Sequence, residues 1–152
     1  EMVIKGPQVM KGYWNDPELT AAKLRDGWLY TGDLARIDQD GFFYLVDRKD
    51  DMIISQGFNV YPGQIEEILK VHPAVLDAAV VGVDDRLRGQ AIVAVIVLKE
   101  GAQAKKDELM AYCKQHLPDY RVPKTILIRD VIPRDPAGKL LRRVLRQDVR
   151  EA

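Results

Sequence analysis

The residues best suited to chemistry lie near the C-terminus, in a turn-rich segment that ends in a single lysine. Pro133 and Pro136 fix their own φ angles, and Gly138 permits a backbone bend that other residues avoid. Lys139 follows directly, and apolar residues recur after it at helical spacing: Leu140, Leu141, Val144, Leu145 and Val149. A long cation held between a stiff loop and a helix is suited to an anionic group such as phosphate.

A second group of polar residues lies in the first third of the chain. In the stretch YTGD (30–33) a carboxylate follows a glycine, which in a strand marks a bulge or the close approach of a ligand. An ionised Asp33 can accept two hydrogen bonds from a ribose diol, although the same residue can simply end a strand. Arg48 suits phosphate or ribose hydroxyls, although within five charged residues (47–51) it can equally be a solvated linker residue.

Residues 56–62 (QGFNVYP) place a glycine and an aromatic residue just before a predicted helix start. Gly57 allows a ligand to approach the backbone, and the helix start offers unpaired amide groups. A plain strand–turn–helix connection explains the same residues. The segment is therefore a candidate binding loop with a structural alternative.

Several reactive residue types are expected to have structural roles only. His72 and His116 lie near predicted helix ends, and each lacks a second ligand at metal spacing. Cys113 is in step with the apolar residues of a predicted helix, as a small buried hydrophobe would be. The last helix carries four arginines opposite its apolar stripe, which favours a solvated surface over a nucleic-acid site: Arg142, Arg143, Arg146 and Arg150.

The composition is that of an ordinary globular protein. The 152 residues are 47% hydrophobic and 30% charged, with 23 basic and 23 acidic residues, so no excess charge favours a nucleic-acid partner. The longest apolar run, residues 91–98, is far shorter than the ~20 residues that span a bilayer. A single cysteine excludes an intrachain disulfide and a cysteine zinc site, which fits the cytoplasm. The first residues show neither a signal stretch nor a basic leader, and they resemble a strand entered partway.

The order of the elements predicts two parts. The first part is β-rich, with a strand at residues 2–4, a short helix capped by Asp16, and a hairpin of residues 30–37 and 42–47. The charged residues 47–51 form the best boundary. Strands and helices then alternate, with strands at 52–55, 58–60, 76–83, 91–98 and 125–129, helices at 62–71 and 105–117, and a terminal helix after the lysine. The predicted fold class is α+β, a small sheet flanked by helices and preceded by a β-rich segment.

Together these motifs resemble the adenylate-forming superfamily of acyl-CoA synthetases, luciferases and non-ribosomal peptide synthetase adenylation domains. The resemblance covers nearly the whole chain, through GPQVMKGYWN (6–15), WLYTGD (28–33), DRKDDMI (47–53), PRDPAGK (133–139) and LLRR (140–143). GFNVYP (57–62) and YRVPK (120–124) are most similar to bacterial fatty-acyl-CoA ligases. Gln56 departs from the family, which often has a serine or another small residue there.

The resemblance implies a domain organisation. Residues 1–48 would be the end of the family's large N-terminal domain, and residues 49–152 its mobile C-terminal domain, with a hinge near Asp50. The phosphate-binding loop of the large domain has no match here. The chain is therefore expected to be inactive alone and to need the missing N-terminal domain.

The resemblance also implies a reaction and site residues. In this family a carboxylic acid reacts with ATP to give an acyl-adenylate, and a thiol then displaces AMP. Lys139 would be catalytic in the first step, and Asp33, Arg48, Tyr30 and Thr31 would bind the nucleotide. Gly57 and Phe58 would line the pantetheine channel after rotation about Asp50. ATP with Mg²⁺, bound mainly by the missing domain, and CoA as co-substrate are expected, with no metal ligand in this chain.

The expected partners are a carboxylic acid, in particular a fatty acid, with ATP and CoA, and neither nucleic acid nor a membrane-spanning segment. Peripheral contact with a membrane remains compatible with the sequence. Three alternatives to the ligase are compatible with parts of the sequence: a stand-alone binding or regulatory module, an adenylation-domain tail that acts with a carrier protein, and a nucleic-acid-binding domain on the terminal arginines. The YTGDL strand argues against an independent module, since such a module has little use for part of a neighbouring domain.

Overall fold

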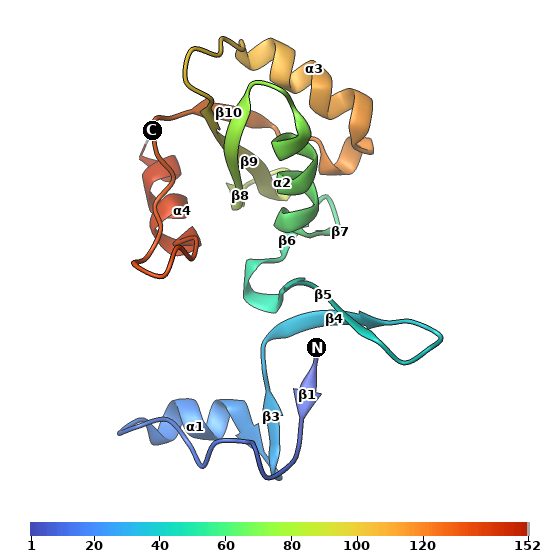
Figure 1. Ribbon diagram of the computed structural model, residues 1–152, viewed down its shortest axis with the longest axis vertical. Helices are drawn as coiled ribbons and strands as arrows, with labels where there is room; N and C mark the ends of the chain where they lie inside the picture. The colour runs from blue at the N-terminus through green and yellow to red at the C-terminus, as the bar shows by residue number, and fades with distance from the viewer. Residues whose placement is uncertain (152) are drawn as a thin grey trace. The chain divides into compact units, whose positions relative to one another are not determined.

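The computed structural model describes residues 1–151, and the chain divides into two compact units. Unit 1 comprises Glu1–Asp50, and unit 2 begins at Asp51. Figure 1 shows unit 1 in blue to cyan and unit 2 in green to red.

Unit 1 opens with a small antiparallel sheet and one short helix. The sheet has the order β1–β3–β2, from strands β1 (Val3–Ile4), β2 (Leu24–Arg25) and β3 (Trp28–Tyr30). Helix α1 (Pro17–Lys23) begins where the sequence predicts, because the Asp16 carboxylate accepts a hydrogen bond from the Leu19 amide at 2.8 Å. Proline at the first helical position adds to this start signal.

The second half of unit 1 is a hairpin of β4 (Asp33–Ile37) and β5 (Phe43–Arg48). The prediction of one strand over residues 30–37 is wrong, because β3 ends at Tyr30 and β4 starts at Asp33. Gly32 between them has φ of +77°, so the chain turns there and the two strands join different sheets. In the hairpin, Asp33 lies opposite Arg48.

Over residues 51–151, unit 2 contains a five-stranded sheet and three helices. After the 3₁₀ turn η1 (Lys49–Asp51), its elements are β6 (Ile53–Ser55), β7 (Phe58–Val60), α2 (Pro62–Val71), β8 (Val75–Asp85), β9 (Gly89–Leu98), α3 (Lys106–His116), η2 (Asp119–Arg121), β10 (Thr125–Ile128) and α4 (Arg142–Arg150). Helix α4 starts at Arg142 rather than directly after Lys139, because Leu140 still pairs with Arg134 in a β-bridge.

Strand β9 is the central strand of this sheet, and it forms a long antiparallel hairpin with β8 (Figure 1). Strand β10 pairs with β9 in parallel, with Thr125 opposite Val93, and β6 meets β9 at the pair Ser55 and Gly89. The loop that carries Lys139 follows β10 along the chain, so the sheet determines where this loop begins.

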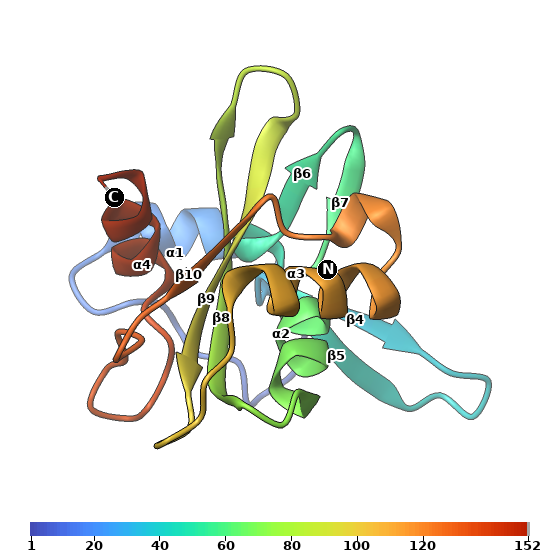
Figure 2. The same ribbon diagram turned by 90° about the horizontal axis from the view of Figure 1, so that it is seen from above.

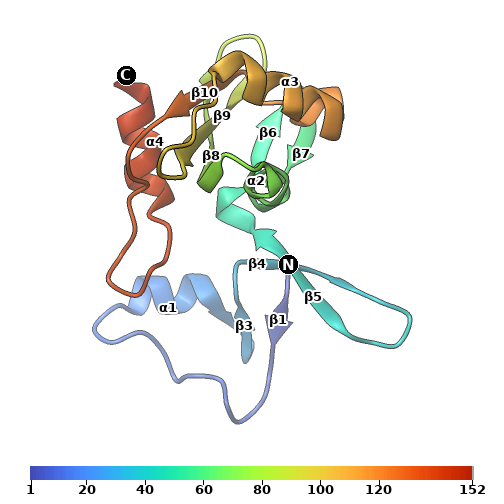
Figure 3. The same ribbon diagram turned by 45° about the horizontal axis from the view of Figure 1, so that its top comes forward.

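Helices cover both faces of the sheet. Figures 2 and 3 show α2 and α3 on one face and α4 on the other. Because side chains alternate along a strand, Val80 of β8 packs in the cluster with α2 and α3, whereas Val81 packs in the cluster with Leu145 of α4. This arrangement confirms the predicted fold class, a small mixed sheet flanked by helices.

Candidate functional site

The loop that carries Lys139 is held by its own backbone. The Asp135 amide donates to the Lys139 carbonyl at 2.9 Å, and the Asp135 carboxylate accepts from the amides of Ala137 at 2.9 Å and Lys139 at 2.8 Å. Gly138 has φ of +82°, and its amide donates to the Asp135 carbonyl at 2.9 Å. Another residue type would be strained in this conformation, so the glycine allows the turn that precedes the lysine.

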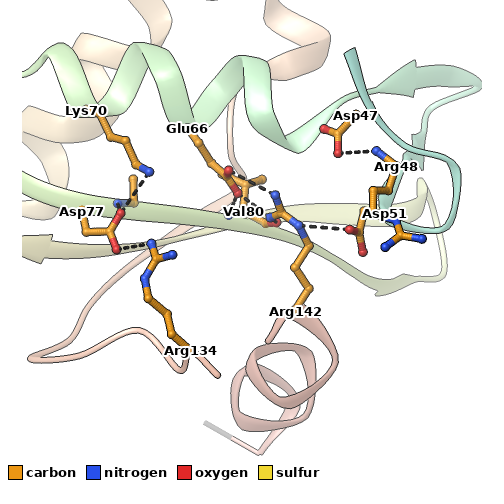
Figure 4. Close-up of polar contacts among 10 residues, drawn as sticks. Asp47, Arg48, Asp51, Glu66, Lys70, Asp77, Val80, Arg134 and Arg142 are labelled. Atoms are coloured by element: carbon orange, nitrogen blue, oxygen red, sulfur yellow. Dashed lines mark hydrogen bonds and ion pairs between the residues drawn. The ribbon is translucent and has the colours of Figure 1, made fainter. Parts of the chain in front are cut away.

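Arg134 fastens the same loop to the body of unit 2. Its Nη1 donates to the Gly138 carbonyl at 2.8 Å, and its Nη2 donates to Asp77 Oδ2 of β8 at 2.6 Å (Figure 4). Asp77 Oδ1 also pairs with Lys70 of α2 at 3.0 Å. Partial burial raises the pKa of Asp77, but the hydrogen bonds from Arg134 and Lys70 outweigh it, so the pKa lies below its ordinary value. Asp77 is therefore an ionised anchor for the loop.

The side chain of Lys139 itself is exposed, and it pairs with none of the residues that the structure describes. A rigid loop thus presents a cation whose hydrogen bonds are still to be made. This arrangement fits the charge-stabilising role predicted for Lys139, which stays a prediction.

In unit 1, the hairpin brings Asp33 and Arg48 together. The two residues are opposite in register, and Arg48 Nε lies 3.6 Å from Asp33 Oδ1. The Arg48 amide donates to the Asp47 carboxylate at 2.8 Å (Figure 4). The side chains of Asp33 and Arg48 are partly exposed, and they line a shallow pocket of about 220 Å³ together with Leu45 and Val46. The arrangement leaves carboxylate oxygens of Asp33 accessible to hydroxyl donors.

Tyr30 and Thr31 adjoin this pair but already have partners. The Thr31 hydroxyl donates to the Met2 carbonyl at 2.7 Å and accepts from the Asp33 amide at 3.1 Å. The Tyr30 ring lies 5.0 Å from the Arg25 guanidinium, which is cation–π distance. Thr31 therefore shapes the turn that orients Asp33. Tyr30 lines a separate pocket of about 210 Å³, which Gly32 also lines.

Asp50 lies in the turn η1, between two residues that are each held elsewhere. The Lys49 amide donates to the Gly32 carbonyl at 2.7 Å within unit 1. Asp51 Oδ2 pairs with Arg142 Nε at 3.3 Å within unit 2. The division between the units falls directly after Asp50. The predicted hinge residue is thus flanked by an anchored residue on each side.

Gly57 and Phe58 lie at the turn between β6 and β7. Gly57 has φ of +82°, and a Cβ atom at this position would have no neighbour within 4 Å. The positive φ of the turn therefore favours glycine here, and a lack of space does not. The preceding Gln56 also has a positive φ, of +53°. Phe58 is half exposed and stacks on Tyr120 with 4.6 Å between ring centroids. The predicted channel loop is therefore a tight turn with an aromatic wall.

Part of the chain matches a known family model. Residues 64–139 match the AMP-binding enzyme C-terminal domain, which is half of the chain. The chain belongs to this family. The match confirms the resemblance inferred from the sequence.

Relatives of this AMP-binding C-terminal domain are ligases. A long-chain-fatty-acid–CoA ligase of Bacillus subtilis is 50% identical over 99% of this chain and 27% of its own length. A 2-succinylbenzoate–CoA ligase of Geobacillus kaustophilus is 48% identical over 97% of the chain and 30% of its own length. Among solved structures, ATP-bound MatB from Rhodopseudomonas palustris aligns with a TM-score of 0.90 and 36% identity, covering 97% of this chain and 29% of MatB. The chain thus spans less than a third of these relatives.

One prediction about the C-terminal domain is wrong. Arg142 was expected on a solvated helix surface, but its side chain is only 15% exposed and pairs with Glu66 and Asp51 (Figure 4). The helical period of α2 contained a signal, because Glu66 falls on the same stripe as the buried Ile65 and Leu69. A carboxylate on a buried stripe requires a cation or several donors. Its partner on α4 could not be chosen from spacing alone.

Cys113 is buried, as predicted for a small apolar residue on this helix. Burial raises the pKa of the Cys113 thiol to about 11, so it stays protonated and inert at neutral pH. His72 is buried, and its Nδ1 accepts from the Ala74 amide at 3.2 Å. Within residues 1–151, no group of three or more metal-ligating side chains gathers, and no helix is long and apolar enough to cross a bilayer.

Proposed function

We propose that this chain is the C-terminal part of an ATP-dependent acyl-CoA ligase that forms an acyl-adenylate and then an acyl-CoA. The observation that carries the proposal is the rigid loop that presents the exposed ammonium of Lys139. The names of the relatives, which are CoA ligases, support the same reaction. A fatty acid is the proposed acid, on the strength of the Bacillus subtilis relative.

In the first half-reaction, a carboxylate oxygen of the acid attacks the α-phosphorus of ATP. A new P–O bond forms while the bond to the bridging oxygen of pyrophosphate breaks. Lys139 places its ammonium beside the oxygens on which negative charge increases, and it needs no reorganisation because its loop is already fixed. The described residues offer no cluster of metal ligands, so in this proposal the Mg²⁺ that accompanies ATP belongs to the missing domain.

The nucleotide is oriented by the hairpin of unit 1. Asp33 accepts hydrogen bonds from the ribose hydroxyls, and Arg48 fixes the Asp33 carboxylate and contacts ribose or phosphate oxygens. Tyr30 and Thr31 shape the adjoining turn. The register that pairs Asp33 with Arg48, and the pocket that both line, support these roles.

In the second half-reaction, the thiolate of CoA attacks the acyl carbonyl carbon. This thiolate forms when the CoA thiol gives its proton to solvent; in the attack the thioester bond forms and the bond from the acyl carbon to the AMP oxygen breaks. Rotation about Asp50 withdraws Lys139 and brings the turn of Gly57 and Phe58 to the pantetheine chain. The exposed aromatic face of Phe58 and the anchored neighbours of Asp50 support this assignment.

The test is Lys139→Ala in the protein that joins this chain to its N-terminal domain. Adenylate formation, measured by ATP–pyrophosphate exchange with a fatty acid, should fall by about 10²–10³-fold, as for other preorganised charge-stabilising groups. Thioester formation from supplied acyl-adenylate and CoA should be nearly unchanged. Lys106→Ala, which removes another exposed lysine, is the matched control and should affect neither step. Equal losses in both steps, or no loss in the first, would overturn the role of Lys139.

A further inference from the structure

Arg142 is a charged side chain in a largely buried position where helix α4 begins. Its guanidinium reaches three segments that are far apart in the sequence. It pairs with the Glu66 carboxylate through Nη1 and, at 3.1 Å, through Nη2; Nη1 also donates to the Val80 carbonyl at 2.9 Å, and Nε lies 3.3 Å from Asp51 Oδ2. Figure 4 shows these contacts converging on the one guanidinium. The planar guanidinium carries five N–H donors and can serve these four acceptor oxygens at once, whereas an ammonium has only three donors, all on one nitrogen.

The Glu66 side chain that pairs with Arg142 is itself held in place by other contacts. It is buried on α2, and its Oε1 also accepts from the Val80 amide at 2.8 Å. Because burying a carboxylate without partners is costly, the guanidinium and the amide together hold Glu66 in place. Arg142 is thus fixed against α2 and β8.

Two working segments adjoin Arg142: the lysine loop (residues 133–141) and the hinge at Asp50. Lys139 lies three residues before Arg142, and the Leu141 amide closes the intervening loop by donating to the Pro133 carbonyl at 3.0 Å. Asp51 follows the hinge residue Asp50 directly. One guanidinium therefore fixes the base of the lysine loop and the first residue beyond the hinge.

We propose that Arg142 is a positioning residue for both half-reactions, because it aims the lysine loop and sets the unit 2 boundary of the hinge. The proposal rests on the proposed ligase function. Because Asp51 is fixed to unit 2, the rotation of this unit takes place about the backbone of Asp50 alone. The pivot is therefore the same in each catalytic cycle. With Leu141 fixed, Lys139 starts from one defined geometry.

Arg134 provides a comparison within the same loop. It also ties the lysine loop to β8, through Asp77, but it makes no contact with the hinge among the described residues. Arg150 provides a control on the same helix as Arg142, since it forms an exposed pair with Asp84 at 2.5 Å. The three arginines thus differ in which segment each one holds: loop and hinge, loop only, and neither.

The experiment compares Arg142→Lys, Arg134→Lys and Arg150→Gln in the protein that includes the N-terminal domain. Because displacements of about 1 Å can cost up to ~10²-fold in rate, we expect Arg142→Lys to lower kcat by about tenfold or more in both half-reactions, with smaller changes in KM. Arg134→Lys should lower adenylate formation alone, and Arg150→Gln should change neither step. If Arg142→Lys resembled Arg134→Lys or Arg150→Gln, the dual role would be wrong.

Hydrogen exchange by mass spectrometry gives a readout that does not depend on activity. Arg142→Lys should speed exchange in peptides covering residues 47–53 and 133–141, while the β9 strand at 89–98 stays protected. Faster exchange throughout unit 2 would show a general structural role and would contradict the proposal. If the wild-type protein formed no acyl-adenylate, the proposed function would fail, but this exchange pattern would still decide whether Arg142 holds both segments.

A second variant covers the case in which Arg142→Lys does not fold. Asp51→Asn removes the charge of the hinge contact and leaves the Glu66 pair intact. It should impair thioester formation more than adenylate formation, with faster exchange at residues 47–53 only. An unchanged thioester step together with unchanged exchange would overturn the hinge part of the proposal.

Discussion

Unit 2 encloses apolar side chains between its sheet and its helices, whereas in unit 1 the glycine Gly32 is the single buried residue among residues 1–50. Unit 1 instead exposes large apolar side chains, with Phe43 64% and Leu45 68% exposed on β5. Its order comes from short strand pairs and local caps. The contrast indicates that unit 2 has its own core, while unit 1 exposes apolar side chains of the kind that often mark an interaction surface. This supports the proposal that residues 1–48 end a larger domain.

The strongest test of this contrast is a pair of leucine truncations. Leu69 of α2 is fully buried, so Leu69→Ala should lower the free energy of unfolding of unit 2 by about 2–5 kcal/mol. Leu45→Ala is the matched exposed variant in unit 1, and it should change the free energy of unfolding of unit 1 by no more than about 0.5 kcal/mol. Urea unfolding followed by circular dichroism measures both. Equal effects would show that unit 1 has a core that its exposed side chains conceal.

A smaller effect is expected where unit 1 relies on a local cap. Asp16→Ala removes the hydrogen bond that the carboxylate accepts from Leu19, so α1 should lose about 1 kcal/mol. Amide exchange of α1 should speed up accordingly, while β8 and β9 of unit 2 stay protected. Asp40→Ala in the exposed hairpin turn is the control. A loss of protection in unit 2 would show that the two units are not independent in stability.

The smallest expected effect is on how the stability of unit 2 depends on pH. The pKa of Asp77 is below its ordinary 3.8, so its contribution to the stability of unit 2 is present above that pH and is lost as the pH falls through the folded-state pKa. Asp77→Asn should therefore destabilise unit 2 at pH 7 by about 0.5 kcal/mol, typical of a partly exposed pair. Below pH 3.8 the difference from wild type should shrink. In unit 1, the amide of Phe42 lowers the pKa of Asp38 within the hairpin turn, so protonation of Asp38 should affect that turn. A difference independent of pH would contradict the ionised anchor.

Local signals predicted the parts of the site that local chemistry builds. The cap at Asp16, the hairpin of β4 and β5, and the turn with Gly138 depend on residues only a few positions apart. The break at Gly32 was missed because the residues on both sides of it have strand character, and the choice of sheet partner decides where each strand ends.

Arg142 was missed for a different reason. Helical periodicity assigns residues to a polar or an apolar side of α4, and an arginine at the margin fits the polar side. Its partner Glu66 is 76 positions away in the sequence, and only the packing of α4 over β8 brings the two together. Such long-range polar contacts leave little signal in the local sequence. Arg142 and Glu66 are therefore harder to predict from the sequence than the lysine loop and the hinge that they hold.

The parallel pairing of β10 with β9 has a consequence for how the domain is made. The β8–β9 hairpin closes over a short turn, whereas β10 can dock only after the whole crossover through α3 has folded back. Closing a longer loop costs more chain entropy, so the hairpin is expected to form first and β10 late. The segment from β10 to Lys139 is then expected to reach its anchor on β8 only after β10 has docked. A chain in which β10 has not docked should therefore lack the Arg134–Asp77 contact that fastens this segment to the sheet.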